Sequence, residues 1–183
     1  MHLQRPRQLL SCAVLGASLL LSACGFHLRG TGVDDIALKE LHVSARDNNG
    51  PTHQSVMEAL RINGVTVSSA APYHLQLLEE QQLRRALNYV SRSRSTPAEY
   101  ALRHQLVYQI SNSAGQALIG PETLTAERNY VRDRDNVTGS REEEVLLQRE
   151  MRNDLTRQLM FRLARLSPSD LAARQQALER LAD

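Results

Sequence analysis

Arginines gather in one stretch near the middle of the chain. Between Gln81 and Ala98 the sequence has four arginines and no acidic residue. These are Arg84, Arg85, Arg92 and Arg94. A guanidinium group binds a phosphate or a carboxylate through two parallel hydrogen bonds, which the ammonium group of lysine cannot do. The stretch therefore predicts an anion-binding tip, and the alternative is a solvated hairpin without a ligand, because exposed runs of charge commonly serve solubility.

A cysteine follows an apolar run close to the N-terminus. Arg5 and Arg7 precede the run Leu9–Leu21, which is shorter than the ~20 residues that a membrane-spanning helix needs and is typical of a secretory signal. The run ends in Leu21-Ser22-Ala23-Cys24, which resembles the processing box of bacterial lipoproteins. We therefore expect cleavage before Cys24, a diacylglyceryl group on its sulfur and an acyl group on its new amino terminus. Such a covalent lipid anchors a protein to a membrane.

The residue after this cysteine indicates a destination. Gly25 stands where an aspartate would suggest retention at the inner membrane. By resemblance to sorted lipoproteins, we expect the periplasmic face of the outer membrane. The alternative is an ordinary signal peptide followed by an unpaired cysteine.

Composition and motifs exclude several classes of function. The 183-residue chain has a net charge of +2, all of it within residues 1–23, so the mature part is formally neutral and has no general attraction for nucleic acid. Aromatic residues make up only 4% of the chain, which argues against base-stacking surfaces. The sequence has no glycine-rich phosphate loop, no Gly-x-Ser-x-Gly and no His-Glu-x-x-His, so we expect no enzyme.

The histidines of the mature part are scattered without the spacing of metal ligands. They are His27, His42, His53, His74 and His104. A metal site needs three or four converging donors, so we expect no metal and no cofactor beyond the lipid on Cys24. A hydrolase would require an unrecognised serine or aspartate to converge on His104 in a deep pocket.

Hydrophobic periodicity indicates which elements position these residues. Alternating patterns predict strands over 38–45, 65–69, 74–91, 100–110 and 118–130. In the strand 74–91, the pattern predicts that Leu75, Leu77, Leu83 and Leu87 share one face. A first helix is expected between Gly50-Pro51 and Asn63-Gly64, because proline favours a helix start and glycine a helix end.

A long second helix is predicted after the last strand. Ser140 and Glu143 have the spacing of a capping box, which predicts that the helix begins there, with Glu142–Glu144 in its first turn. Asn136-Val137-Thr138 is then expected in the preceding turn. Leucines and a methionine recur at steps of three and four residues and form an apolar stripe. They are Leu147, Met151, Leu155, Leu159, Leu163 and Leu166.

These elements predict an α+β fold. Two main helices would pack on one face of a largely antiparallel or mixed sheet of about four strands with long hairpins, followed by a short C-terminal helix. We expect residues 1–23 to be a lipoprotein signal peptide, residues 24–166 a lipid-anchored periplasmic domain, and residues 167–183 a helical tail.

The start of the mature chain carries a family resemblance. Cys24-Gly25-Phe26-His27-Leu28-Arg29 resembles the mature start of the LptE family, the small lipoprotein subunit of the outer-membrane lipopolysaccharide translocon. Leu60–Val65 and Ala98-Glu99-Tyr100 resemble further segments of that family. The order of elements also matches, and the resemblance extends from Cys24 to about Leu166.

The resemblance implies a non-enzymatic function. A member of this family sits largely inside the lumen of the large β-barrel LptD, plugs it, assists its folding, and binds lipopolysaccharide during insertion into the outer leaflet. Family members contact lipopolysaccharide phosphates near a strand-connecting loop and near the start of the long helix. The matching residues are Arg92, Arg94 and Arg141, and the nearby Arg84 and Arg85 join them as candidates. The expected partners are LptD, lipopolysaccharide and outer-membrane lipid.

A different class of protein would have the same general layout. A lipid-anchored α+β domain could also be a generic periplasmic adaptor, such as a secretin pilot or an auxiliary subunit of a lipid transporter. The identity of the protein partner distinguishes the two.

Overall fold

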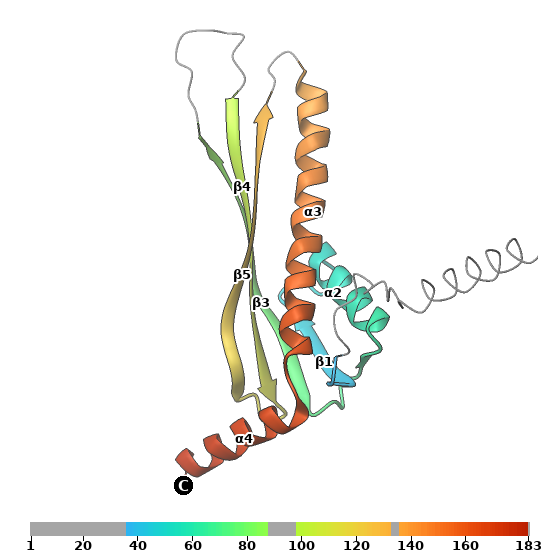
Figure 1. Cartoon of the computed structure of the whole chain (residues 1–183), viewed down its shortest axis with the longest axis vertical. Helices are drawn as coiled ribbons and strands as arrows, with labels where there is room; N and C mark the ends of the chain where they lie inside the picture. Colours follow the sequence, from blue (N-terminus) through green and yellow to red (C-terminus); the bar gives the residue numbers. More distant parts are fainter. Residues whose placement is uncertain (1–35, 88–97, 133–135, 183) are drawn as a thin grey trace, which may run out of the picture. The chain divides into compact units, whose positions relative to one another are not determined.

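One mixed sheet organises the chain. The computed structural model describes residues 36–87, 98–132 and 136–182. Its elements are β1 (Glu40–Ala45), α2 (Pro51–Ile62), β2 (Thr66–Val67), β3 (Tyr73–Ala86), β4 (Ala98–Asn112), β5 (Ala117–Arg132), α3 (Val137–Ala164) and α4 (Pro168–Ala182). In this part of the chain the strand order is β2-β1-β3-β4-β5 (Figure 1). β1 is parallel to β2 and β3, whereas β3, β4 and β5 are antiparallel neighbours. The predicted α+β class is confirmed. The sheet in the described ranges has five strands where about four were expected, and the shortest, β2, lies within the segment 65–69 that was predicted as a strand.

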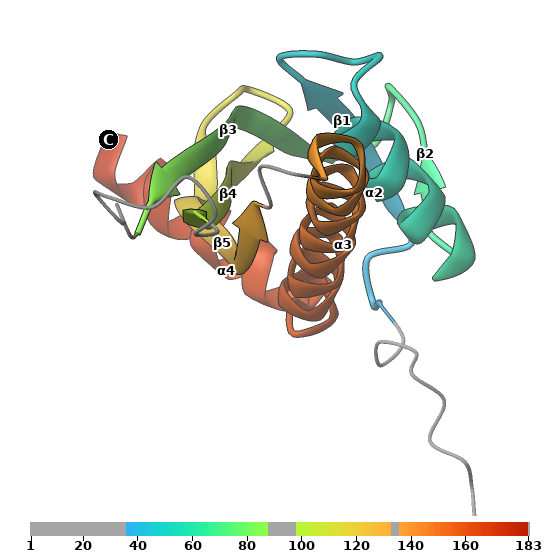
Figure 2. The same cartoon turned by 90° about the horizontal axis from the view of Figure 1, so that it is seen from above.

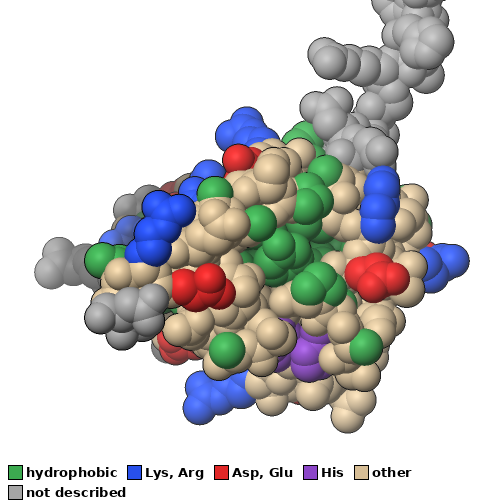
Figure 3. Space-filling view, turned by 90° about the horizontal axis from the view of Figure 1, so that it is seen from below, with side chains coloured by type: hydrophobic (Ala, Val, Ile, Leu, Met, Phe, Trp, Pro, Cys, Tyr) green, Lys and Arg blue, Asp and Glu red, His purple; other side chains and the backbone are tan. Residues whose placement is uncertain are grey.

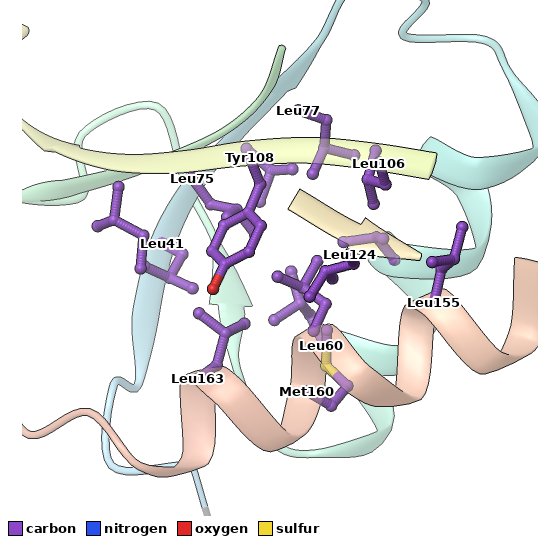
Figure 4. Close-up of a cluster of buried hydrophobic side chains, with 14 of the residues drawn as sticks. Leu41, Leu60, Leu75, Leu77, Leu106, Tyr108, Leu124, Leu155, Met160 and Leu163 are labelled. Carbon is purple, nitrogen blue, oxygen red and sulfur yellow. The ribbon is translucent and has the colours of Figure 1, made fainter. Parts of the chain in front are cut away.

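Both main helices pack on the same face of the sheet (Figure 2). The predicted apolar stripe of α3 is confirmed, because Leu155, Leu159 and Leu163 are fully buried. Figure 4 shows Leu163 and Leu60 from the helices directed toward Leu75 and other side chains of the sheet. Full burial of one such leucine contributes about 1.5–3 kcal/mol, so this stripe supplies much of the energy that holds α3 on the sheet.

The sheet has two unequal halves. The parallel pairing of β1 with β3 ends where Ala45 faces Leu77, while β3 continues to Ala86. Beyond that point β3, β4 and β5 continue as a three-stranded sheet beside the first turns of α3 (Figure 1). This extension carries the candidate site.

The predicted face of β3 is wrong beyond Leu77. The register shifts between Leu77 and Glu79, so Leu78 is an extra residue that reverses the alternation. As a result, Glu80 and Arg84 contact residues of the helices, whereas Leu83 is half exposed. Residues 88–91 of the predicted strand lie outside the described part of the chain.

The predicted start of the long helix is also wrong. α3 begins at Val137, and its N-cap is Asn136, whose side chain accepts a 3.1 Å hydrogen bond from the backbone N–H of Gly139. Ser140 lies inside the helix, and its hydroxyl donates to the carbonyl of Asn136 over 3.0 Å. Asparagine caps a helix as well as serine does, so the earlier residue starts the helix. Glu142–Glu144 consequently lie in the second turn, and 136–138 is not a separate turn.

The C-terminal helix begins as expected. The hydroxyl of Ser167 accepts from the backbone N–H of Asp170 over 3.1 Å and donates to the Asp170 carboxylate over 2.6 Å. The hydrogen bond from the Ser167 hydroxyl to the carboxylate, together with a second one from the Ser167 backbone N–H over 3.3 Å, lowers the pKa of Asp170. Leu171 is fully buried against the rest of the core, so α4 is docked at its first turn.

Candidate anion-binding pocket

Three of the six predicted site residues lie in the described part of the chain. Arg84 and Arg85 are on β3, and Arg141 is in the second turn of α3. Cys24, Arg92 and Arg94 lie outside the described residues. Arg84 and Arg85 are neighbours on a strand, so their side chains leave opposite faces of the sheet.

A pocket lies between the end of the sheet and α3. Arg84 from β3, Arg132 from the end of β5 and Arg141 from α3 line it, and its volume is about 450 Å³. The remaining lining residues are Ser140, Glu144, Val145 and Gln148. The structure therefore brings together Arg84 and Arg141, which are 57 positions apart in the sequence. These two arginines were both predicted as candidates for anion binding.

Arg132 belongs to this pocket and was missed from the sequence. It is the last residue of β5, and α3 begins at Val137. A short connection forces the end of one element and the start of the next to lie close together. Arginines on both sides of such a connection can therefore be predicted to share a site, and this reasoning would have placed Arg132 beside Arg141.

A carboxylate lies inside this group of arginines. Oε2 of Glu144 is 3.3 Å from Nη1 of Arg84 and accepts a 2.8 Å hydrogen bond from the hydroxyl of Tyr130. Burial, together with the hydrogen bond to Glu144, raises the pKa of Tyr130, so the phenol keeps the proton that it donates. Glu144 is thus held from two sides.

The same arginine rests on an aromatic surface. The guanidinium carbon of Arg84 is 5.4 Å from the centre of the Tyr100 ring. Tyr100 in turn stacks on Tyr130, with ring centroids 5.6 Å apart. Attraction between a cation and the face of an aromatic ring stabilises this placement, so β3, β4, β5 and α3 together position the Arg84 side chain.

The pocket has an excess of positive charge. Among the described residues, the side chains of Arg132 and Arg141 form no ion pair, while Arg84 pairs with Glu144. Among the described side chains that line the pocket, three cations and one anion leave a net charge of +2. Such a pocket can bind an anion that carries two negative charges or two neighbouring anionic groups.

Arg85 does not join this pocket. It lines a smaller hollow of about 140 Å³ on the opposite face of the sheet, with Leu83, Ala101, Arg103 and Glu127. Arg103 is paired there with Glu127. The excess charge of this hollow is therefore smaller than that of the pocket beside α3.

A second polar cluster lies near the middle of the sheet and joins the fully buried Thr52 and His104 to the partly exposed Glu80. The carboxylate of Glu80 accepts a 2.6 Å hydrogen bond from the Thr52 hydroxyl and lies 2.7 Å from Nε2 of His104. His104 is fully buried, and the hydrogen bond from His104 is the main cause that lowers the pKa of Glu80. Because an ionised carboxylate only accepts, Nε2 carries the shared hydrogen.

This cluster does not have the arrangement of a hydrolase. In a nucleophilic triad the hydroxyl is bonded to the imidazole, which is oriented by the carboxylate. Here the Thr52 hydroxyl is bonded to the carboxylate of Glu80. Nδ1 of His104 is buried without a hydrogen-bond partner in the described residues, so it activates no nucleophile there. The cluster instead joins the start of α2 to β3 and β4.

Two further features bear on the kind of protein. Across the described ranges, no group of three or more histidine, cysteine or acidic side chains is placed to hold a metal ion. No helix within those ranges is long and apolar enough to span a membrane.

Solved structures share this fold. A minor lipoprotein from Acinetobacter baumannii matches with a TM-score of 0.61 and 28% identity, over 70% of this chain and 92% of that one. A lipoprotein B from Nitrosomonas europaea matches with a TM-score of 0.61 over 76% of this chain and 90% of that one, at 16% identity, which supports the fold alone. The chain is therefore an α+β domain of a type found in bacterial lipoproteins.

Sequence comparisons identify the family. Residues 38–163 match the family model "LptE: Lipopolysaccharide-assembly". An LPS-assembly lipoprotein LptE from Photorhabdus laumondii is 28% identical over 154 residues, which cover 82% of each chain. The LptE of Pectobacterium atrosepticum is 27% identical over 168 residues, 89% of each chain. The chain belongs to the LptE lipopolysaccharide-assembly family, whose members are non-enzymatic lipoproteins of the outer membrane.

Proposed function

We propose that this protein binds the phosphate groups of lipopolysaccharide in the pocket of Arg84, Arg132 and Arg141, while it occupies the lumen of the large barrel LptD. The observation that carries the proposal is the convergence of three guanidinium groups from β3, β5 and α3 on one pocket. Guanidinium forks match phosphate oxygens in geometry and charge. Arg92 and Arg94, between β3 and β4 in the sequence, extend the proposed binding surface.

The exposed face of the sheet supports a place inside a barrel. α2 and α3 pack on one face (Figure 2). The opposite face of β3, β4 and β5 carries mainly polar side chains, such as Gln81, Gln105 and Thr125, with the half-exposed Leu83 among them. The interior of a large outer-membrane barrel is polar, so a polar sheet face suits contact with its inner wall.

The proposed anchor is the lipid on Cys24. Cleavage before Cys24 removes residues 1–23. Residues 24–166, acylated at Cys24, then form the anchored domain, and residues 167–183 are its tail. Two or more acyl chains are sufficient for stable attachment to a membrane. The protein would then face the periplasm from the outer membrane, with the arginine pocket held at the barrel.

Charge reversal in the pocket tests phosphate binding. Arg132→Asp with Arg141→Asp converts two uncompensated cations into anions. We expect lipopolysaccharide binding by the purified lipoprotein to weaken at least tenfold at low salt, and the difference to shrink at high salt because screening weakens exposed charges. Arg149→Asp with Arg180→Asp is the matched control, since it changes the net charge by the same amount through two exposed arginines, on α3 and α4, that do not line the pocket.

The control decides the interpretation. Equal binding by the pocket double variant and by the control double variant at positions 149 and 180 would contradict phosphate binding in this pocket. The barrel contact is tested separately by purification of the tagged native lipoprotein through detergent and high salt. LptD should co-purify with wild type and with the pocket variant alike, whereas a secretin or a transporter subunit in its place would favour the adaptor alternative.

A further inference from the structure

The structure assigns Glu144 a role as the resident anion of the arginine pocket, which an incoming phosphate must replace on Arg84. This inference rests on the proposed binding of phosphate in the same pocket. It adds that the protein contains its own competitor for the ligand. The carboxylate lines the pocket and pairs with Arg84 over 3.3 Å.

The geometry keeps the carboxylate inside the pocket. The Tyr130 hydroxyl donates to Oε2 of Glu144 over 2.8 Å, on the same oxygen that faces Arg84. The Glu144 side chain is only 21% exposed, whereas the Arg84 side chain is 47% exposed. The acid is therefore the better buried partner, and the arginine is the one that solvent and ligands reach.

Neighbouring acids on the helix are placed differently. Glu142 and Glu143 are exposed on the outer side of α3 and do not line the pocket. Of the three consecutive glutamates, only Glu144 turns toward the sheet. Glu144 therefore acts on a bound anion more strongly than Glu142 and Glu143 do. Nothing in the sequence distinguishes the three glutamates in this respect.

Glu144 therefore limits the affinity of the pocket for phosphate, which allows a bound lipopolysaccharide to be released. A phosphate that binds Arg84 must either displace Glu144 from the guanidinium group or share that group with it. In both cases the negative charge of Glu144 repels the phosphate. A protein that hands a lipid onward gains from such an opposing charge, because binding without it would be slower to reverse. Arg132 and Arg141, which have no acid partner in the described residues, attract the anion first.

Glu144→Gln tests this role, since it removes the charge and retains the size of the side chain. The interaction free energy of two unit charges about 4 Å apart in water corresponds to a roughly fivefold change in a binding constant. We therefore expect the full-length lipoprotein with Glu144→Gln to bind purified lipopolysaccharide about fivefold more tightly than wild type at low salt. Glu142→Gln is the matched control, with the same change of net charge two residues away, and should change binding little.

Two further arms separate the explanations. If Glu144 acts through Arg84, the gain from Glu144→Gln should largely disappear in an Arg84→Gln background. It should also disappear with dephosphorylated lipopolysaccharide, which retains the acyl chains. Glu144→Ala serves as a second variant in case the glutamine perturbs folding, which thermal unfolding monitors.

The outcomes distinguish this inference from the proposed function. Tight binding of lipopolysaccharide by wild type, with equal gains from Glu144→Gln and Glu142→Gln or no gain from either, would overturn the competitor role and leave the pocket intact. Failure of wild type to distinguish lipopolysaccharide from its dephosphorylated form would overturn phosphate recognition itself, and with it both proposals.

Discussion

Replacement of Glu80 by glutamine should destabilise the fold, because Glu80 is the acceptor that satisfies two buried donors. Thr52 and His104 both bond to its carboxylate, at 2.6 and 2.7 Å. Hydrogen bonds to a charged group contribute about 1.5–3 kcal/mol each, against about 1 kcal/mol for neutral pairs. The Glu80 side chain is 33% exposed, and solvent screening therefore favours the lower part of this range. We expect a loss of about 2 kcal/mol in the free energy of unfolding.

Urea unfolding at neutral pH measures this loss as a lower midpoint with an unchanged slope. Glu79→Gln is the matched control, since Glu79 is exposed and accepts its hydrogen bond from the exposed Gln81 side chain. Surface substitutions of this kind stay within about 0.5 kcal/mol. Equal midpoints for the two variants would refute the reasoning that the Glu80 cluster ties α2 to the sheet.

The effect should also depend on pH in a defined direction. The hydrogen bonds to Glu80 lower its pKa from the model-compound value of 4.5. A carboxylate with a depressed pKa in the folded state stabilises the fold fully above its unfolded-state pKa, and loses this contribution as the pH falls through the folded-state pKa. The gap between wild type and Glu80→Gln should therefore be constant above about pH 5 and narrow in more acidic solution.

Three further tests use substitutions in the core, at two glycines and at the start of the long helix. Leu155→Ala should cost about 2–5 kcal/mol in urea unfolding, because the side chain is fully buried in the core. Gly120→Ala should cost more than Gly115→Ala: both glycines have positive φ, but a Cβ at 120 would meet backbone atoms at 2.8 and 2.9 Å, whereas one at 115 would meet nothing within 4 Å. Asn136→Ala should cost about 1 kcal/mol as the loss of a helix cap, and Glu143→Ala should be close to neutral in the same assay. A larger loss for Glu143→Ala than for Asn136→Ala would restore the rejected capping box.

The helices and the positions of the strands along the chain could be predicted because they depend on local patterns. The spacing of Leu155, Leu159 and Leu163 requires one buried helical face, and these residues are buried. The start of α3 could not be placed from spacing, because Asn136 and Ser140 are both good helix caps.

The faces of β3 could not be predicted for a different reason. Alternation in a strand has a period of two, so one extra residue such as Leu78 reverses every later side chain. No composition signal marks that bulge. As a result, Leu83 is half exposed, while Glu80 contacts buried His104 and Arg84 reaches Glu144.

The pocket was predictable only in part. Arg84 and Arg141 stood out as arginines near a proposed tip, but their meeting depends on the register of three long strands. Glu144 was interpreted as one of three equivalent helix-start acids, although it is 60 positions from its partner Arg84. Long-range pairs of this kind follow from the packing of a helix on a sheet and not from spacing in the sequence.

The two ends of the domain differ in chemistry. At the end opposite the pocket, hydrophobic side chains gather in the middle of the surface, and charged groups lie toward its margin (Figure 3). Among the described residues of the sheet, His42 on β1 and His74 on β3 stack with ring centroids 4.0 Å apart. The arginine pocket lies at the other end of the sheet, where β5 ends and α3 begins.

Photo-crosslinking in living cells tests the pocket most directly. Val145 lines the pocket and is 51% exposed, whereas Phe161 lies on the same helix outside the pocket lining and is 50% exposed. A photoreactive amino acid at position 145 should form adducts with lipopolysaccharide, and the same group at position 161 should form few or none. Adducts of equal yield at both positions, or none at position 145 in a protein that remains bound to its barrel, would contradict recognition of lipopolysaccharide by the arginine pocket.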